Sequence, residues 1–596
     1  MKSNLIKNIF NLLSTKEKRK FKLLFLFFII TGIFEIAGIA SIAPFMAVVS
    51  SPEIIQNNNY LNNVYNYFGF TSTNDFLVML GVLVILLLVI SNSIAALTVW
   101  KLTSFANNQS HVLSVKLLKS YLSNSYEFFL NNNSSTLEKN ILSEVNRGVS
   151  GVMLPALLLI VKLIIVIFIL ILLVVVNPII TFASIFILGG LYLLMYKFMR
   201  NYLMEIGISF TKVDSERYKL VVEILSGIKN LKLNVNESEF VKQYSIPSKL
   251  HAKYATQNSL ITQMPRYIVE TISFTGIVGI IIYFIYQGEK ANEVIPLISI
   301  FALASYRLAP ALQQIYHSIS QIKYTLPAIN LLVTDIKDDH EILFKDLSDK
   351  DFLEYKSLLV LNNVSFKYLN SKKESLSNIS VNIAPNTTVG IVGETGSGKT
   401  TLVDLMLGLI TPSSGSFSVD GVNLDKDNLA LWQRNIGYVP QDIFLLDNTI
   451  ARNIAFATTD ENIAIEDIKF VCRIAGISEF IEQLPEGYQT VVGERGSKLS
   501  GGQIQRLGIA RALYKNPSVI VFDEATSALD NITEKIVMEA VNNFSHKKTI
   551  IMISHRLSSI RNCDIIHVMD KGSIVDSGSY DELINTSIIF QKLVNS

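Results

Sequence analysis

The chain has 596 residues, of which 49% are hydrophobic and 17% are charged, and its formal net charge is +2. Typical soluble proteins have roughly 25% charged residues, so this composition indicates a membrane protein with a soluble part and length for two or more domains. The near-neutral charge argues against a protein that binds nucleic acid.

Six apolar stretches are long enough to cross a membrane as helices, which takes about 20 residues. They are residues 21–49, 76–100, 154–176, 179–199, 268–286 and 294–315. The third and fourth are separated only by Asn177 and Pro178, which predicts a tight turn. The basic, amphipathic tail before the first stretch predicts a helix that lies along the membrane surface. We expect no cleavable signal peptide, because the apolar run behind this tail is too long.

Lysine and arginine predict the orientation of the six spans. They are frequent in the N-terminal tail, between spans two and three and between spans four and five, and they are absent or sparse in the other loops. This alternation places the N-terminus, the two long segments and everything after span six in the cytosol. We expect both segments to be helical and to return through short polar bends near residues 126–135 and 227–237, which suit docking onto a cytosolic domain.

The loop after span one, residues 52–70, places Leu61, Val64, Tyr65 and Phe68 at helical spacing. This pattern predicts a short amphipathic helix on the outer side of the membrane. Two interpretations remain open: the helix rests on the membrane surface and touches a lipid tail, or it is a plain surface helix.

Charged residues inside the spans are candidates for a substrate site, because each is costly in a membrane unless it is used or paired. Glu35 lies in the middle of span one, Arg307 in the middle of span six, and Arg266 and Glu270 at the start of span five. Guanidinium groups suit phosphate oxygens. The alternative is an internal salt bridge, for instance between Glu35 and Arg307.

The composition becomes that of a soluble protein from about residue 358. Residues 388–409, "TVGIVGETGSGKTTLVDLMLGL", predict a buried strand, a glycine loop and a helix that fit the phosphate-loop pattern. Backbone N–H groups of such a loop bind phosphates at a helix N-terminus, Lys399 adds a positive charge, and Thr400 is a candidate ligand of Mg²⁺.

A second predicted strand, in residues 518–530, "SVIVFDEATSALD", ends at Asp523 and Glu524. A carboxylate at the end of an apolar strand is the expected Mg²⁺ partner of a phosphate loop, which assigns that role to Asp523. Glu524 is then placed to orient or deprotonate an attacking water. The two cysteines, Cys472 and Cys563, have no metal-type spacing, and we expect reduced thiols without a chemical role.

Further motifs follow in a fixed order between Tyr368 and His555, and with them the chain resembles a half-transporter of the ATP-binding-cassette exporter superfamily. The resemblance implies that adenine stacks on Tyr368, that Gln441 touches Mg²⁺ and water, and that His555 contacts the γ-phosphate. It identifies residues 493–496, "GERG", as a cross-talk segment and residues 527–530 as a loop that signals between two ATP sites. The residues expected to bind ATP are Tyr368, Gly393, Gly396, Ser397, Gly398, Lys399, Thr400, Thr401, Ser500, Gly501, Gly502, Gln503 and Asp530. The expected Mg²⁺ ligands are Thr400, Gln441 and Asp523, and the expected catalytic residues are Glu524, His555 and Gln441.

Residues 499–503, "LSGGQ", match the signature of that superfamily. A serine hydroxyl and bare backbone N–H groups at a helix N-terminus can clamp an anion. The resemblance implies that this clamp faces the phosphate loop of a second copy. We therefore expect a homodimer that binds two ATP molecules and hydrolyses both.

The stretches around Glu35 and Arg307 resemble bacterial lipid-linked-oligosaccharide flippases, which implies a polyprenyl-diphosphate glycan as substrate and a cavity in which Arg307, Arg266 and Glu35 handle it. The alternative substrates are a lipid A-type glycolipid, a phospholipid or a hydrophobic drug. The short N-terminal tail without a cysteine argues against peptide exporters that carry a protease domain there. A cassette ATPase that acts on nucleic acid or ribosomes does not agree with the six spans.

The expected fold is an α-helical membrane domain of exporter type, with six transmembrane helices and long cytosolic extensions, joined to an α/β P-loop nucleotide-binding domain with a helical subdomain. The expected boundaries are 1–325 for the transmembrane domain, 326–357 for a linker and 358–596 for the ATP-binding cassette. We expect the protein in the inner membrane of a bacterium, with the cassette in the cytosol.

Overall fold

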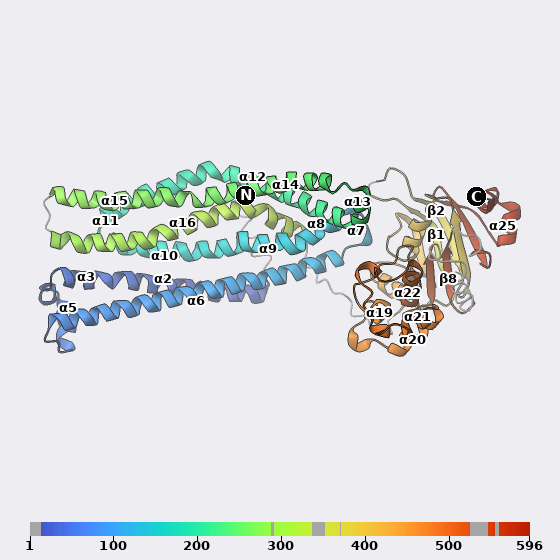
Figure 1. Cartoon of the computed structure of the whole chain (residues 1–596), viewed down its shortest axis with the longest axis horizontal. Coiled ribbons are helices and arrows are strands. Elements are labelled where there is room, and N and C mark those ends of the chain that lie inside the picture. The colour runs from blue at the N-terminus through green and yellow to red at the C-terminus, as the bar shows by residue number, and fades with distance from the viewer. Residues whose placement is uncertain are drawn as a thin grey trace. The chain divides into compact units, whose positions relative to one another are not determined.

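A computed structural model describes residues 14–287, 291–336, 352–369, 371–524, 546–554 and 560–595. The chain divides into two compact units: Met1–Asn124 with Phe128–Ile342, and Ser125–Glu127 with Leu343–Ser596. The described part of the first unit contains helices and no strand, whereas the second unit combines helices with two β-sheets (Figure 1).

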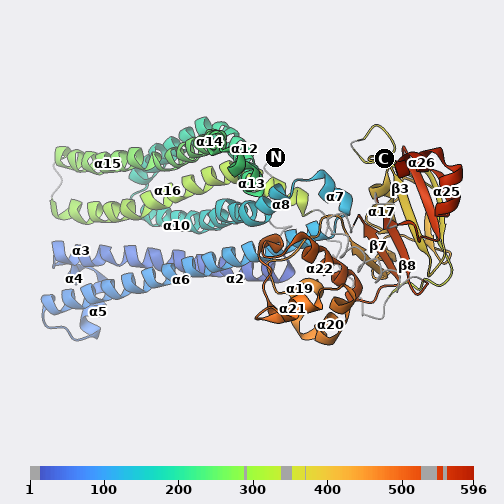
Figure 2. The ribbon, with the colours of Figure 1, turned by 45° about the vertical axis from the view of Figure 1, so that its right-hand side comes forward.

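Long helices that run side by side form the first unit (Figures 1 and 2). In chain order they are α2 (Thr15–Ala40), α3 (Ile42–Ser50), α4 (Ile54–Asn57), α5 (Asn59–Tyr67), α6 (Thr73–Leu122), α7 (Tyr126–Asn131), α8 (Ser134–Lys139), η1 (Asn140–Glu144), α9 (Val145–Gly148), η2 (Val149–Met153), α10 (Leu154–Val176), α11 (Pro178–Ser184), η3 (Ile185–Gly189), α12 (Gly190–Ser226), α13 (Ile228–Asn234), α14 (Glu237–Gln263), α15 (Pro265–Gln287) and α16 (Ala291–Asp335). The segments η1, η2 and η3 are single π-helical turns inside otherwise continuous helices.

Four helical stretches among the described residues have the length and composition to cross a membrane. They are Thr15–Val49, Thr73–Leu122, Ser134–Val176 and Pro178–Ser226, and they contain the first four predicted spans. The predicted spans five and six fall on α15 and α16. Within the bundle, α10 packs against α2 and α16, and α12 packs against α14 and α16.

Proline positions explain where the apolar helices begin and end. The first predicted span is divided into α2 and α3 at Ser41, because Pro44 has no N–H to donate to the carbonyl of Ala40. Asn177 ends α10 and accepts a hydrogen bond from the N–H of Ile180, and Pro178 is the first residue of α11. The predicted tight turn between spans three and four is present.

The helical segments beyond the predicted cytosolic ends of the spans are joined by buried polar contacts. The predicted bends are short helices, α7 and α13. Lys139 and Glu144 form an ion pair of 2.8 Å with side chains that are 0% exposed, and Lys139 donates to the hydroxyl of Ser215 on α12 at 2.6 Å. Arg217, also on α12, donates to the hydroxyl of Tyr244 on α14 at 3.2 Å. These contacts hold α8, α12 and α14 together.

The predicted outer helix is present as α5, and its apolar residues differ in exposure. Leu61 and Tyr65 pack with a buried cluster that includes Phe76, and the rings of Tyr65 and Phe76 are 5.3 Å apart. Val64 is 39% exposed and Phe68 is 63% exposed. The predicted short helix is therefore confirmed, and both interpretations of its surface stay predictions.

Two sheets form the core of the second unit. The antiparallel sheet has the order β2-β1-β4-β5, and the larger sheet has the order β10-β9-β3-β8-β7-β6. The strands are β1 (Leu359–Phe366), β2 (Leu376–Ile383), β3 (Thr388–Gly393), β4 (Ser414–Val419), β5 (Val422–Asn423), β6 (Ile436–Val439), β7 (Val519–Asp523), β8 (Thr549–Ile553), β9 (Ile565–Asp570) and β10 (Ser573–Gly578). Strands β3, β8, β7 and β6 are parallel neighbours, so their carboxyl ends meet at one edge.

Helices complete this unit. They are α17 (Lys399–Met406), α18 (Leu429–Gln433), α19 (Ile450–Ile454), α20 (Ile465–Ile474), α21 (Ser478–Glu482), α22 (Gly501–Tyr514), α25 (Tyr580–Thr586) and α26 (Ile588–Asn595), with short 3₁₀ turns η4 (Asp460–Asn462), η5 (Gly487–Gln489) and η6 (Glu494–Gly496). One buried cluster lies between the two sheets around α17, and another extends under α19 to α22. Cys472 and Cys563 are buried free thiols, and burial raises the pKa of each to about 12.

Candidate nucleotide site

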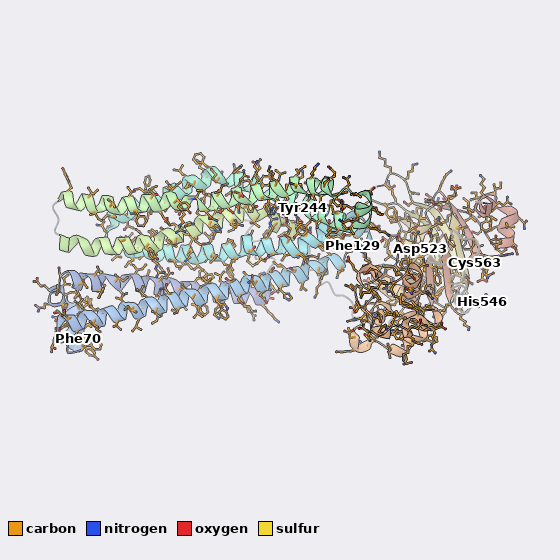
Figure 3. All side chains as sticks on the ribbon, viewed as in Figure 1. Phe70, Phe129, Tyr244, Asp523, His546 and Cys563 are labelled. Atoms are coloured by element: carbon orange, nitrogen blue, oxygen red, sulfur yellow. The ribbon has the colours of Figure 1, made fainter. Side chains whose placement is uncertain are left out.

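The candidate site lies at the carboxyl edge of the parallel strands. The phosphate loop follows β3, Asp523 ends β7 with Glu524 directly after it, and Gln441 follows β6. Figure 3 shows Asp523 in this unit. His555, which follows β8, and Asp530, with the rest of residues 527–530, lie outside the described residues.

The phosphate loop is folded around the ammonium group of Lys399. Its Nζ donates to the carbonyl oxygens of Gly393 at 2.9 Å and Glu394 at 3.0 Å, and the side chain is only 6% exposed. Burial lowers the pKa of the Lys399 ammonium, while the nearby carboxylates of Glu524 and Asp523 act in the opposite direction. The two hydrogen bonds place the Nζ of Lys399 inside the loop.

Two glycines allow the loop to pass close to neighbouring backbone. A Cβ atom on Gly393 would overlap the carbonyl oxygen of Met569, and one on Gly398, where φ is +101°, would lie 2.8 Å from the carbonyl oxygen of Ser375. Gly396 also has a positive φ, of +83°. The hydroxyl of Ser397 is buried and has no hydrogen-bond partner in the described part of the chain, so it is free to donate to a bound phosphate.

The carboxylates and the amide predicted to act at this site are brought together. Asp523, 7% exposed, accepts a hydrogen bond from the hydroxyl of Tyr438 at 3.2 Å. Burial raises the pKa of the Asp523 carboxyl, and Tyr438 opposes this rise while Glu524 adds to it. Gln441 donates from Nε2 to Oε2 of Glu524 at 2.9 Å. Tyr438 lies three residues before Gln441 and was not predicted to act at this site.

Glu524 has a backbone conformation that is rare outside glycine, with φ of +51°. The N–H of Glu524 donates to the carbonyl of Ile553 at the end of β8, at 3.0 Å, which fixes the turn after β7. Such left-handed residues cost about 1 kcal/mol or more and gather at functional sites, so this conformation supports the predicted role of Glu524.

The residues at this edge fit Mg²⁺. A threonine hydroxyl, an amide oxygen and one buried carboxylate are oxygen donors of the kind that Mg²⁺ takes together with phosphate oxygens. Thr400 is exposed, and the amide of Gln441 points its Nε2 at Glu524, which leaves its oxygen for a cation. No cluster of three metal-ligating His, Cys, Asp or Glu side chains occurs among the described residues.

Tyr368 lies next to the helix that follows the phosphate loop. Its hydroxyl is 3.3 Å from that of Thr401 on α17, and its half-buried ring meets the edge of Phe366 at 4.9 Å. The ring is thus held beside the loop, where the predicted stacking with adenine remains a prediction.

The signature segment forms a helix N-terminus as predicted, but two of its side chains are engaged locally. Ser500 caps α22: its hydroxyl accepts from the N–H of Gln503 at 3.3 Å, and the side chain of Gln503 accepts from the N–H of Ser500 at 2.8 Å. The N–H groups of Gly501 and Gly502 have no acceptor among the described residues. No hydrogen bond between described residues joins this segment to the phosphate loop of the same chain.

The four charged residues that are candidates for a substrate site lie in two pairs. Arg307 Nη1 lies 3.8 Å from Oε1 of Glu35, and its Nη2 donates to Oδ1 of Asn92 at 3.3 Å. Arg266 Nε donates to Oε1 of Glu270 at 2.6 Å on the exposed face of α15. The salt bridge between Glu35 and Arg307 is therefore present as a long contact, and a substrate role for these residues remains a prediction.

Comparison with known proteins agrees with both units. Residues 21–257 match the family model "ABC transporter transmembrane region", and residues 376–527 match the model "ABC transporter". The chain thus has segments that match both the transmembrane and the ATP-binding parts of ABC transporters. The predicted fold class, an exporter-type helical domain with a P-loop ATPase domain, is confirmed.

Solved and curated relatives cover different shares of this chain. A bacterial Atm1-family ABC exporter solved with ATP bound has the same fold, with a TM-score of 0.78 and 22% identity over 98% of this chain and 99% of that one. ABC transporter B family member 21 of Arabidopsis thaliana is 40% identical over 250 residues, 42% of this chain and 19% of that protein. Leukotoxin translocation ATP-binding protein LktB of Mannheimia haemolytica is 42% identical over 234 residues, 39% of this chain and 33% of that protein. The chain thus matches a third or less of these curated relatives' length.

Proposed function

We propose that this protein couples ATP hydrolysis to export of a substrate from the cytosolic side of a membrane. The observation that carries the proposal is the group formed by Lys399, Asp523 and Glu524 at one strand edge, in a chain whose helices are also long and apolar enough to cross a membrane. A phosphate loop with an ion-binding carboxylate and a neighbouring base is the equipment for phosphoryl transfer to water.

The residues of the loop bind and orient the nucleotide in this proposal. The loop N–H groups and Lys399 bind the β- and γ-phosphates, and Tyr368 stacks on adenine. Thr400, Gln441 and Asp523 hold Mg²⁺, which when bound neutralises phosphate charge. Glu524, oriented by the hydrogen bond from Gln441, takes the proton of the water that attacks the γ-phosphate, and His555 contacts that phosphate.

Two copies of the chain complete the proposed ATP sites. The free N–H groups of Gly501 and Gly502 at the start of α22 suit an anion, and we assign to them the γ-phosphate bound by the phosphate loop of the partner. ATP then favours the closed pair of cassettes, and hydrolysis releases it, which shifts the membrane helices between two arrangements.

For the substrate we propose a polyprenyl-diphosphate glycan. Arg307 lies in the middle of predicted span six, its side chain is 28% exposed, and its contact with Glu35 is long at 3.8 Å. A guanidinium that is only loosely paired can exchange a carboxylate for the oxygens of a diphosphate.

Reconstitution into liposomes tests the proposal. ATPase activity would be measured with a polyprenyl-diphosphate glycan, with lipid A, with phospholipids and with a panel of hydrophobic drugs. We expect selective stimulation by the diphosphate-linked glycan. Selective stimulation by another amphiphile would contradict the proposed substrate but not ATP-driven export. Absence of any ATPase activity would contradict both proposals.

A further inference from the structure

The first unit contains a polar cavity of about 280 Å³. Its walls are formed by η2 together with the start of α10, by the end of α14 and by α16. None of the eleven residues that line it is Asp, Glu, Lys or Arg. Hydroxyl and amide groups dominate, among them Ser150, Asn258, Gln314 and Gln321. The cavity therefore suits a ligand group that is polar and uncharged.

The polar side chains of this cavity are partly organised and partly unsatisfied. Asn258 Nδ2 on α14 donates to Oε1 of Gln321 on α16 at 3.1 Å, and Gln321 Nε2 is 3.4 Å from the hydroxyl of Thr325. Within the described residues, Oδ1 of Asn258 and Nδ1 of His317 are buried and lack a hydrogen-bond partner. Unsatisfied groups of this kind call for a partner, and a ligand that both donates and accepts hydrogen bonds supplies one.

The cavity belongs to the cytosolic membrane boundary by the predicted topology. By the predicted topology, spans three and five begin on the cytosolic side, and span six ends there. The cavity is lined by residues 150–158 at the start of span three, by residues 258–263 before span five and by residues 314–321 at the end of span six. The head group of a lipid in the cytosolic leaflet lies at this level. A π-helical turn, η2, contributes Ser150 to the wall, and such turns inside α-helices occur frequently at functional sites.

We propose that this cavity binds the sugar nearest the diphosphate of the substrate while the lipid is still in the cytosolic leaflet. The proposal rests on the proposed function and adds a second contact to it. Gln314 is seven residues from Arg307 on α16, which is about 10 Å along the helix, so a diphosphate and the sugar attached to it can span both.

The chemistry of the wall supports a sugar over the other parts of the substrate. Neutral amides exchange hydrogen bonds with hydroxyls at small net cost, whereas a diphosphate without a cation in this cavity would be poorly compensated. Leu154 and Pro155 provide an apolar side for the C–H face of a sugar ring. The volume lies just below the range of roughly 300–1,000 Å³ of small-molecule sites, which fits one portion of a large amphiphile.

A double variant, Gln314→Leu with Gln321→Leu, removes two amides from this wall. Its matched control is Gln313→Leu, an adjacent half-buried glutamine on the same helix that does not line the cavity. The proteins would be reconstituted, and the half-maximal concentration for ATPase stimulation would be measured with a polyprenyl-diphosphate glycan and with the same polyprenyl diphosphate without sugar. The midpoint of thermal unfolding would be recorded for each.

We expect the wild type and Gln313→Leu to respond at lower concentration to the glycan-bearing lipid than to the bare lipid. In the double variant the half-maximal concentration for the glycan-bearing lipid should rise roughly tenfold, toward that of the bare lipid, because two side-chain hydrogen bonds are lost. An unchanged preference, an equal loss for both lipids, or an equal effect of Gln313→Leu would each contradict the cavity's role. If neither lipid stimulates the wild type, the proposed substrate is wrong and this inference is wrong with it.

Discussion

Glu524 is the residue whose geometry bears most directly on turnover. Its left-handed backbone and its hydrogen bond from Gln441 hold the carboxylate beside Asp523, which is where an attacking water would be deprotonated. We expect Glu524→Gln to bind ATP with little change and to hydrolyse it about 10²–10⁴ times more slowly, since that is the usual contribution of a general base. Phosphate release and equilibrium nucleotide binding would be measured on the same preparation.

The control for this variant is Glu479→Gln, an exposed glutamate on α21. It makes the same chemical change in the same unit and should leave turnover as it is. Turnover of Glu524→Gln within a few-fold of the wild type would remove Glu524 from the proposed role.

At the residue scale, the motifs predict which side chains surround the phosphates, because each motif places its residues directly at a strand end. The bond from Tyr438 to Asp523 was not predicted, since it depends on the register of β6 beside β7. The capping contacts of Ser500 and Gln503 follow a spacing that is visible in the sequence. The pairing of Arg266 with Glu270 likewise follows from their spacing of four residues.

Asp404 on α17 makes the stability of the ATP-binding unit depend on pH. Burial, and then the nearby Asp523, raises the pKa of the Asp404 carboxyl from 3.8 to about 6. Because the folded-state pKa lies above the unfolded-state value, the stability that Asp404 contributes is fully present below about pH 4 and is lost as pH rises through about 6.

Asp404→Asn keeps a neutral side chain of similar shape at all pH values. We expect its free energy of unfolding, relative to the wild type, to rise by about 2 kcal/mol between about pH 4 and pH 7 and then to level off. The chain has two tryptophans, and Trp432 is buried in this unit, so Trp432 fluorescence in a Trp100→Phe background reports the transition. Parallel stability curves for the two proteins would contradict the raised pKa.

At the scale of elements, the contact of α12 with α16 depends on a residue without a side chain. A Cβ atom on Gly207 would overlap the backbone carbonyl oxygen of Tyr324, whereas one on Gly190, near the start of the same helix, would meet nothing within 4 Å. We expect Gly207→Ala to lower the free energy of unfolding by about 1–3 kcal/mol, because the helices must separate. Gly190→Ala should be neutral or stabilising by up to about 1 kcal/mol, because alanine favours helix.

Denaturation of both glycine variants in detergent, followed by circular dichroism, would measure the difference. If the two substitutions shift the unfolding transition equally, close packing of α12 against α16 does not explain the effect of Gly207→Ala. Similar loss at Gly190 would instead point to a general cost of substituting glycine in this helix.

The elements themselves were largely predictable, and the exceptions have physical causes. Apolar length predicts where the spans lie, and Pro178 predicts the turn between two of them. The break at Ser41 was missed, although Pro44 signals it, because the run is apolar on both sides. The spacing in residues 61–68 predicted α5, but periodicity alone does not show that Leu61 and Tyr65 pack against the cluster around Phe76.

At the scale of the whole molecule, the proposed function requires two copies to share each ATP. The N–H groups of Gly501 and Gly502 find no acceptor among the described residues, and this segment makes no hydrogen bond to the phosphate loop of its own chain. Hydrolysis should therefore depend on association, so the specific ATPase activity in detergent should fall on dilution in proportion to the fraction of dimer.

Mixed preparations separate association from loss of fold. When Glu524→Gln chains are added in excess to wild-type chains at constant total concentration, exchange between copies should lower the activity per wild-type chain, because the Glu524→Gln site of a mixed pair keeps its ATP and holds the two cassettes closed. Addition of Glu479→Gln chains should leave it unchanged. The opposite result would be a constant activity per wild-type chain, together with the molecular mass of one copy by light scattering. It would show that a single chain completes its own ATP site, and it would contradict the coupling of ATP hydrolysis to the closing of two cassettes.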